Sequence, residues 1–230
     1  MKTFSKRFSS EKNKIDTKQE YKIGEAIRLV KTTASANFNE SVEAHIALNI
    51  DPKYADQQLR TTVTLPHGTG KNLRIGVLVP PDKITEAQEA GADVFGSEDL
   101  VEEISKGILN FDLLLATADM MPKLAKLGRI LGPKGLMPSP KAGTVTSNLK
   151  ESIDEFKKGK LEYRADKTGI VHISFGKADF SETQLSENLV AFYQSVEMNR
   201  PSGVKGKYVK TLTLCSTMGP GIHLDFTTLE

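Results

Sequence analysis

The sequence of 230 residues has a single cysteine, Cys215, so an internal disulfide is excluded. One cysteine is also taken to exclude a cysteine-based zinc site, and it is typical of a protein in a reducing compartment. The longest apolar runs, near 75–81 and 113–116, fall far short of the roughly 18 residues that span a bilayer, so we expect no membrane partner. The basic N-terminus, residues 1–14, lacks the apolar core of a secretory signal and is interpreted as a mobile basic tail.

An excess of charge of either sign is also lacking, because the formal net charge is only +2. This balance conceals a polarity in the middle of the chain. Residues 80–119 contain two lysines against ten acids, whereas residues 120–160 contain nine cations against three acids. We therefore predict one acidic edge and one strongly basic edge in this part of the fold.

Catalytic patterns are absent as well. The four histidines show no metal-ligand spacing, and a lone cysteine on a strand is more typical of a small buried side chain than of a nucleophile. The segment 68–71 resembles a phosphate-binding loop, but it lacks the upstream glycine of that motif and has Asn72 where Ser or Thr would hold magnesium. The sequence thus predicts no catalytic residue, no metal and no cofactor.

What the sequence does contain is two kinds of strand. Apolar residues alternate with polar ones over 42–50, 171–175, 208–216 and 222–226, which predicts strands with one buried face. The runs 73–79 and 112–116 are almost continuously apolar, which is typical of parallel strands covered on both faces. A short strand at 94–95 and helices over 82–90 and 97–106 lie between these two runs, and the second helix has a serine, Ser97, as its predicted N-cap.

One-sided strands lie at both ends of the chain and two-sided strands lie in its middle. This order predicts a split two-layer α+β domain made of residues 1–67 and 160–230. An inserted three-layer parallel α/β domain of the Rossmann-like kind would span residues 68–159. Within the split domain, helices are expected from residue 23 and after Ser181, where Ser181 and Gln184 form a capping box.

The segment 128–146, GRILGPKGLMPSPKAGTVT, has four glycines, three prolines and no acid. Glycine permits close backbone approach and proline fixes φ, so the segment is expected to be irregular but stiff. Its cations Arg129, Lys134 and Lys141 would present fixed positive charge to an anionic partner. Solvated lysines on an ordinary surface loop are the alternative interpretation.

Three further polar clusters lie in the split domain: residues 37–41 around Phe38, residues 164–169 followed by His172 and Lys177, and residues 216–221. Each could be an ordinary β-turn. Small hydroxyls, exposed backbone and a few cations are also the groups that recognise RNA through its phosphates and 2′-hydroxyls.

In order and spacing, three motifs closely resemble the L-one family of large-subunit ribosomal proteins. They are Arg164-x-Asp166-Lys167-Thr168-Gly169-x-x-His172, the 128–146 segment, and Ser216-Thr217-Met218-Gly219-Pro220. The resemblance covers residues 21–226. The segment 51–60, DPKYADQQLR, is most similar to the cyanobacterial and plastid branch.

The resemblance implies a structural rRNA-binding protein at the mobile stalk of the large subunit. Such a protein assists release of deacylated tRNA from the exit site and in many bacteria also represses its own mRNA. It would lie in the ribosome of a plastid stroma or a bacterial cytoplasm. The implied rRNA-binding residues are Phe38, Arg164, Asp166, Lys167, Thr168, His172, Lys177, Ser216, Thr217, Met218 and Gly219, with secondary RNA contacts from Arg129, Lys134 and Lys141.

Two alternatives remain at this stage. The inserted α/β domain could hold a nucleotide at its strand ends in an enzyme, although Pro80 and Pro81, not glycines, follow the first parallel strand. The protein could also be a regulator that binds only messenger RNA.

Overall fold

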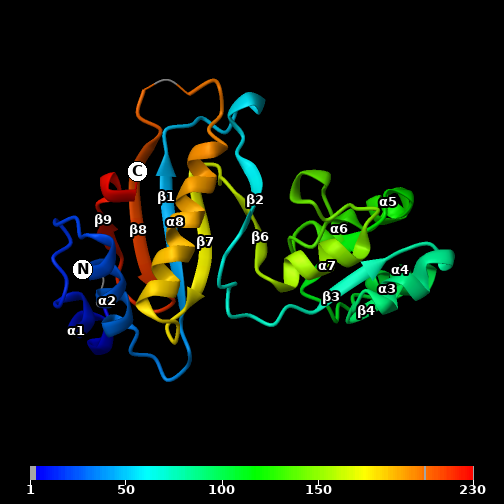
Figure 1. Ribbon diagram of the computed structural model, residues 1–230, viewed down its shortest axis with the longest axis horizontal. Helices are drawn as coiled ribbons and strands as arrows, with labels where there is room; N and C mark the ends of the chain where they lie inside the picture. Colours follow the sequence, from blue (N-terminus) through cyan, green and yellow to red (C-terminus); the bar gives the residue numbers. More distant parts are fainter. Residues whose placement is uncertain (1–3, 205, 230) are drawn as a thin grey trace. The chain divides into compact units, whose positions relative to one another are not determined.

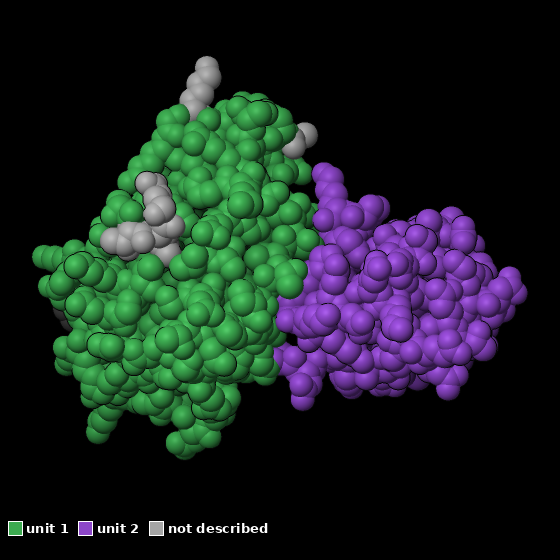
Figure 2. Space-filling view, in the orientation of Figure 1, with its two compact units in different colours: residues 1–70, 161–230 green, residues 71–160 purple. Residues whose placement is uncertain are grey.

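Two distant stretches of the chain fold together in the computed structural model, which describes residues 4–204 and 206–229. Residues 1–70 and 161–230 form unit 1, and residues 71–160 form unit 2 (Figure 2). The sequence placed the crossings between domains near residues 67 and 160. That each unit folds by itself stays a prediction.

Unit 1 is built on an antiparallel sheet in the order β7-β1-β8-β9 (Figure 1). Its strands are β1 (Ser41–Leu48), β7 (Ile170–Lys177), β8 (Val209–Ser216) and β9 (Ile222–Leu224). Every second residue of β1 is buried, as the alternating sequence predicted. A separate pair of strands, β2 (Arg60–Thr64) and β6 (Lys160–Arg164), completes the β-structure of the unit.

Two helices, α2 (Ile23–Thr33) and α8 (Glu182–Met198), pack against this sheet (Figure 1). The predicted capping box is present at the start of α8, where the Ser181 hydroxyl accepts from the Gln184 backbone and the Gln184 side chain accepts from the Ser181 backbone. The core between helices and sheet includes Val30, Ile46, Leu189, Phe192 and Leu214. Unit 1 is therefore a two-layer α+β structure.

Unit 2 is built on a parallel sheet in the order β4-β3-β5, formed by β4 (Val94–Gly96), β3 (Ile75–Leu78) and β5 (Leu113–Ala116). Ile75 and Val77 belong to one hydrophobic cluster with α3 (Ile84–Glu89) and α7 (Leu149–Lys157). Leu78 and Leu114 belong to a second cluster with α4 (Glu98–Ser105), α5 (Met121–Ala125) and α6 (Gly128–Leu131). The sheet is covered on both faces, which confirms the predicted three layers.

Short 3₁₀ turns complete the chain: η1 (Ala55–Gln57), η2 (Pro81–Lys83), η3 (Ala118–Met120), η4 (Pro140–Ala142) and η5 (Phe226–Leu229). The last of these corrects the sequence interpretation, because the final strand ends at Leu224 and Phe226 begins a turn. The N-cap residue of α4 is Ser97, as the sequence predicted. Ser97 precedes the helix, but its side chain makes no capping bond and its buried hydroxyl has no partner among the described residues.

The basic N-terminal segment is ordered from Phe4, contrary to the expected mobile tail; residues 1–3 lie outside the described part. Helix α1 (Lys6–Lys12) begins at Ser5, whose hydroxyl accepts from the Phe8 backbone at 3.3 Å. Glu11 is buried and Ile15 joins the core of unit 1. Within residues 4–204 and 206–229, no helix is long and apolar enough to cross a membrane.

Candidate nucleic-acid interface

The face of the unit 1 sheet opposite α2 and α8 carries a row of polar side chains. We call this the outer face and define it by Ser41, Glu43, His45, Ala47, His172, Ser174, Thr213, Cys215 and His223, all of them half-buried or exposed. It exists because strand side chains alternate between faces and the apolar set faces the helices. The sequence-predicted RNA-binding residues of unit 1 lie on this face or in the turns at its two ends.

One end of the outer face holds two large exposed apolar side chains. Phe38, in the loop before β1, is 55% exposed, and Met218, in the turn after β8, is 49% exposed. Glu40 connects the two loops that carry them. Its carboxylate is 1% exposed and accepts hydrogen bonds from the backbone N–H groups of Ala36 and Met218, each at 2.9 Å.

Glu40 is ionised in this position. Burial alone would raise the pKa of its carboxyl. Hydrogen bonds from the backbone of Ala36 and Met218 and from the Ser216 hydroxyl, together with the charge of Arg7, hold the pKa below its ordinary value. A buried carboxylate that accepts from two loops fixes both loops relative to the sheet. The sequence singles out the cluster 37–41 but does not reveal this role of Glu40. Its only signal was an acid directly before a strand.

The turn after β8 is tied to the start of β1. The Thr217 hydroxyl accepts from the Ser41 backbone N–H at 3.0 Å and lies 3.3 Å from the Ser41 carbonyl. Lys177, opposite Ser41 in the β1–β7 register, donates to the Ser41 hydroxyl at 3.0 Å. Thr217 and Lys177 thus serve the fold as well as any RNA contact.

Ser216 and Gly219 lie within this same turn. Ser216 is 1% exposed, and its hydroxyl faces the Glu40 carboxylate, whose pKa it helps to lower. A Cβ at Gly219 would approach that hydroxyl to 2.4 Å, so any larger residue at this position would require the Ser216 side chain to move.

The opposite end of the outer face is formed by the turn between β6 and β7. The Asp166 carboxylate accepts from the backbone of Thr168 at 2.8 Å and of Ile170 at 2.9 Å, and also from the Thr168 hydroxyl. The Ile170 and Thr168 hydrogen bonds lower the pKa of Asp166 to about 2. Gly169, at φ 80°, closes the turn against the end of β1.

With Asp166 and Thr168 bonded to one another, the turn presents Lys167 and, at the end of β6, Arg164 as exposed cations. The two ends of the outer face are separated by the length of β1, about 24 Å for eight residues. The structure therefore gathers Phe38, Lys177 and residues 216–219 at one end and residues 164–168 at the other.

His172 lies between the two ends. It is paired with His45 across β1 and β7, and the two Nδ1 atoms are 2.8 Å apart. Burial, with a further contribution from the nearby His172, lowers the pKa of His45. Burial raises the pKa of the Cys215 thiol to about 11, so Cys215 is protonated at neutral pH and is not an activated nucleophile.

In unit 2, the segment 128–146 is more regular than its composition indicated. It contains α6 and η4, and residue 145 pairs in parallel with Ala116 beside β5. Arg129, Lys134 and Lys141 are exposed, and none of them makes an ion pair with a residue in the described part of the chain. Their charges are available to an external anion.

Comparison with known proteins gives one consistent result. A profile of the ribosomal protein L1p/L10e family matches residues 30–220. The large ribosomal subunit protein uL1c of Trieres chinensis is 66% identical over 201 residues, covering 87% of each chain. That of Guillardia theta is 63% identical over 98% of this chain and 96% of its own. Protein uL1 of Prochlorococcus marinus (strain MIT 9515) is 57% identical over 100% of this chain and 97% of its own.

Proposed function

Because this chain belongs to the ribosomal protein L1p/L10e family, we propose that the outer face of unit 1 binds large-subunit ribosomal RNA. Family membership makes the chain a structural constituent of the large ribosomal subunit and not a nucleotide-binding enzyme. Its plastid and cyanobacterial relatives place it in the ribosome of a plastid or of a bacterial cytoplasm.

The observation that carries the RNA proposal is the end of the outer face around Glu40. One buried carboxylate joins the backbone of the two loops that carry an exposed aromatic ring, Phe38, and an exposed thioether, Met218. Aromatic side chains stack on unpaired bases, while turns with free cations and hydroxyls contact phosphates and 2′-hydroxyls. The Asp166–Gly169 turn would supply a second contact about 24 Å away along the strands.

The RNA is proposed to be the rRNA of the mobile stalk, and the protein to assist departure of deacylated tRNA from the exit site. This assignment rests on the family resemblance of the turns at 164–172 and 216–220. A second RNA with the same local structure would occupy the same surface. We therefore also propose that the protein represses translation of its own mRNA. Competition between the leader of that mRNA and a stalk rRNA fragment for binding to the protein tests this.

Excision of unit 2 tests the assignment to unit 1. Replacing Lys71–Lys160 with a few glycines should leave a cooperatively folding domain, because a short linker in place of an insert costs little closure entropy. This domain should bind a stalk rRNA fragment within a factor of about ten of the intact protein, or about 1.4 kcal/mol. A folded but non-binding domain would show that the outer face is not the primary site.

Pelleting of the intact protein with large subunits through a high-salt wash tests the ribosomal RNA as partner.

The basic segment of unit 2 is proposed to make secondary contacts. Replacing Arg129, Lys134 and Lys141 together with alanine should weaken RNA binding by less than about tenfold and reduce the slope of log affinity against log salt by up to about 3. Filter binding at several salt concentrations measures both. Lys83 and Lys106, from the acidic half of unit 2, are the control pair. An unchanged salt slope in the triple variant would indicate that the segment is an ordinary surface loop that does not contact RNA phosphates.

A further inference from the structure

Three metal-binding side chains meet in the middle of the outer face. Glu43 and His45 lie two residues apart on β1, and Cys215 lies on β8 directly opposite Glu43. The His45 Nε2 atom is 3.2 Å from the Cys215 sulfur and 4.0 Å from the Glu43 Oε2. One ligand atom from each residue lies within 4.8 Å of the other two, and all three residues are half-buried.

The donor set is selective for one class of metal. A thiolate and an imidazole favour zinc over magnesium or calcium, which prefer oxygen ligands. In tetrahedral zinc geometry a sulfur and a nitrogen ligand lie about 3.5 Å apart, and a nitrogen and an oxygen ligand about 3.3 Å apart. The observed separations of 3.2 and 4.0 Å need only small side-chain movements to reach these values.

The atoms behind His45 support this use. A metal on Nε2 requires a proton on Nδ1, and that nitrogen faces His172 Nδ1 at 2.8 Å. His172 then accepts at Nδ1 and carries its own proton on Nε2, which faces the Asp166 carboxylate at 3.7 Å. Metal-bound histidines commonly donate their other N–H to a carboxylate, a backbone carbonyl or water, and here the neutral His172 ring takes the place of that acceptor.

We propose that Glu43, His45 and Cys215 form a zinc-binding site on the outer face of unit 1. Zinc takes the place of the thiol proton between the sulfur and Nε2, and that proton is released to solvent. Three protein ligands leave one tetrahedral position for water or an external oxygen ligand. The site is independent of the RNA proposal. Its residues come together by cross-strand pairing, which places His45 beside Cys215 although the two are 170 residues apart in sequence.

Zinc titration of the purified full-length protein, in competition with a chromophoric chelator, tests the site. The wild-type protein should bind one Zn²⁺ per chain with micromolar or tighter affinity. Cys215→Ser and His45→Gln should each weaken binding by about a hundredfold or more, and His172→Ala, which loses only the partner of His45, by about tenfold. His223→Gln is the matched control, because His223 lies on the same face and bonds to Thr213. It should bind as the wild type does.

Cobalt substitution identifies the sulfur ligand directly. The Co²⁺ complex should show a thiolate-to-metal charge-transfer band that Cys215→Ser abolishes, and intense visible bands typical of tetrahedral coordination. Glu43→Gln, at a partly exposed position, tests the third ligand without disturbing the core. Absence of stoichiometric zinc binding, or equal binding by Cys215→Ser and the wild type when both are folded by circular dichroism, would overturn the proposal.

Discussion

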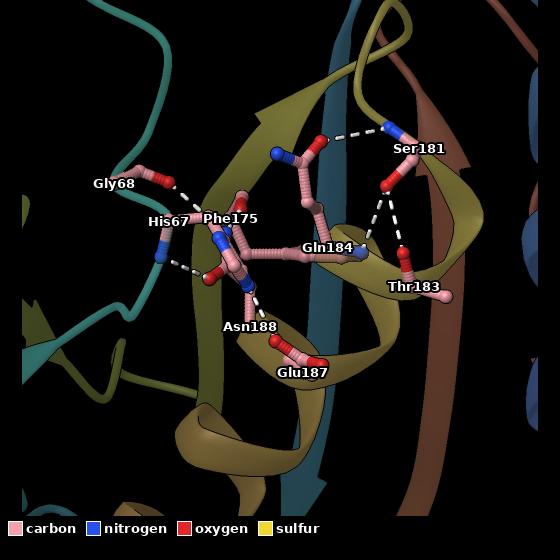
Figure 3. A network of polar contacts seen from close by, with 8 residues as sticks. All are labelled: His67, Gly68, Phe175, Ser181, Thr183, Gln184, Glu187 and Asn188. Atoms are coloured by element: carbon pink, nitrogen blue, oxygen red, sulfur yellow. Dashed lines mark hydrogen bonds and ion pairs between the residues drawn. The ribbon is translucent and has the colours of Figure 1, made fainter.

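Replacing Asn188 with alanine is expected to reduce the free energy of unfolding of unit 1 by about 3 kcal/mol or more. Asn188 lies on α8 and is fully buried, and its amide bonds three backbone groups (Figure 3). The oxygen accepts from the His67 N–H at 3.0 Å, and the nitrogen donates to the carbonyls of Gly68 at 3.0 Å and Phe175 at 2.8 Å. Alanine leaves the Phe175 carbonyl unpaired in the interior and removes the partner of the partly buried groups at His67 and Gly68. Each buried unpaired group costs about 1–3 kcal/mol.

The consequence extends beyond one helix. Asn188 joins α8 to β7 and to the segment at His67 and Gly68 that leads out of unit 1 (Figure 3). His67 also pairs with Glu187, but that pair is largely exposed and contributes little by comparison. The buried amide is therefore the main polar connection between this segment and the core.

Hydrogen exchange followed by mass spectrometry measures the effect within unit 1. Amides of β1 and β7 that exchange only through global opening should exchange about a hundredfold faster in Asn188→Ala, since 1.4 kcal/mol corresponds to a factor of ten. Asn199→Ala is the matched control. Its amide, at the exposed C-cap of α8, donates to the Ser195 carbonyl, so the expected loss is below about 1 kcal/mol. Equal protection in Asn188→Ala and the wild type would contradict the assigned role.

Replacing Glu40 with glutamine is expected to lower the affinity for a stalk rRNA fragment by about ten- to a hundredfold. Both carboxylate oxygens accept a backbone N–H, one from Ala36 and one from Met218. The glutamine amide has the same shape, but its NH2 group would face one of the two backbone N–H groups. Two donors cannot bond to each other, so one of the two loops loses its hydrogen bond to residue 40. A hydrogen bond to a charged group contributes about 1.5–3 kcal/mol. Because the loop that carries Phe38 or Met218 is then no longer held in place, a similar amount of binding free energy for RNA should be lost.

The expected decrease in RNA affinity is opposite in sign to the effect of removing one negative charge. Removing a negative charge should by itself strengthen binding to RNA. Glu182→Gln provides the control, because it removes the same charge from an exposed pair with Arg28 at the start of α8. Its affinity should equal that of the wild type or exceed it slightly. If Glu40→Gln also binds as tightly as the wild type and melts at a similar temperature, Glu40 does not position the interface.

Local sequence patterns were sufficient for most of the framework. Alternation along 42–48 predicted the buried face of β1, because a strand places successive side chains on opposite faces. The continuous apolar runs predicted the parallel strands of unit 2, and the capping box predicted the start of α8. Two local expectations were not met: the Ser97 side chain does not cap α4, and Phe226 begins a 3₁₀ turn instead of continuing the strand.

The interface was predictable only in part. Motifs identified the turns at 164–169 and 216–219, yet no pattern showed that they lie at opposite ends of one sheet face. Glu40 and Met218 are 178 residues apart in sequence, and Asn188 and His67 are 121 apart. Such contacts depend on the register of strands whose pairing involves distant parts of the chain, and no local window contains that information.

The sequence by itself determined which residues face inward, where helices begin, and the family to which the chain belongs, because periodicity and motif spacing are local properties. Tertiary structure alone decided how those elements are joined. A buried carboxylate connects the loops before β1 and after β8, and a buried amide connects α8 to the segment at His67. Pairing of β1 with β8 also places Cys215 beside His45. The physical reason is that an isolated polar group is costly to bury, so each of these side chains is stable only where the fold supplies its partners.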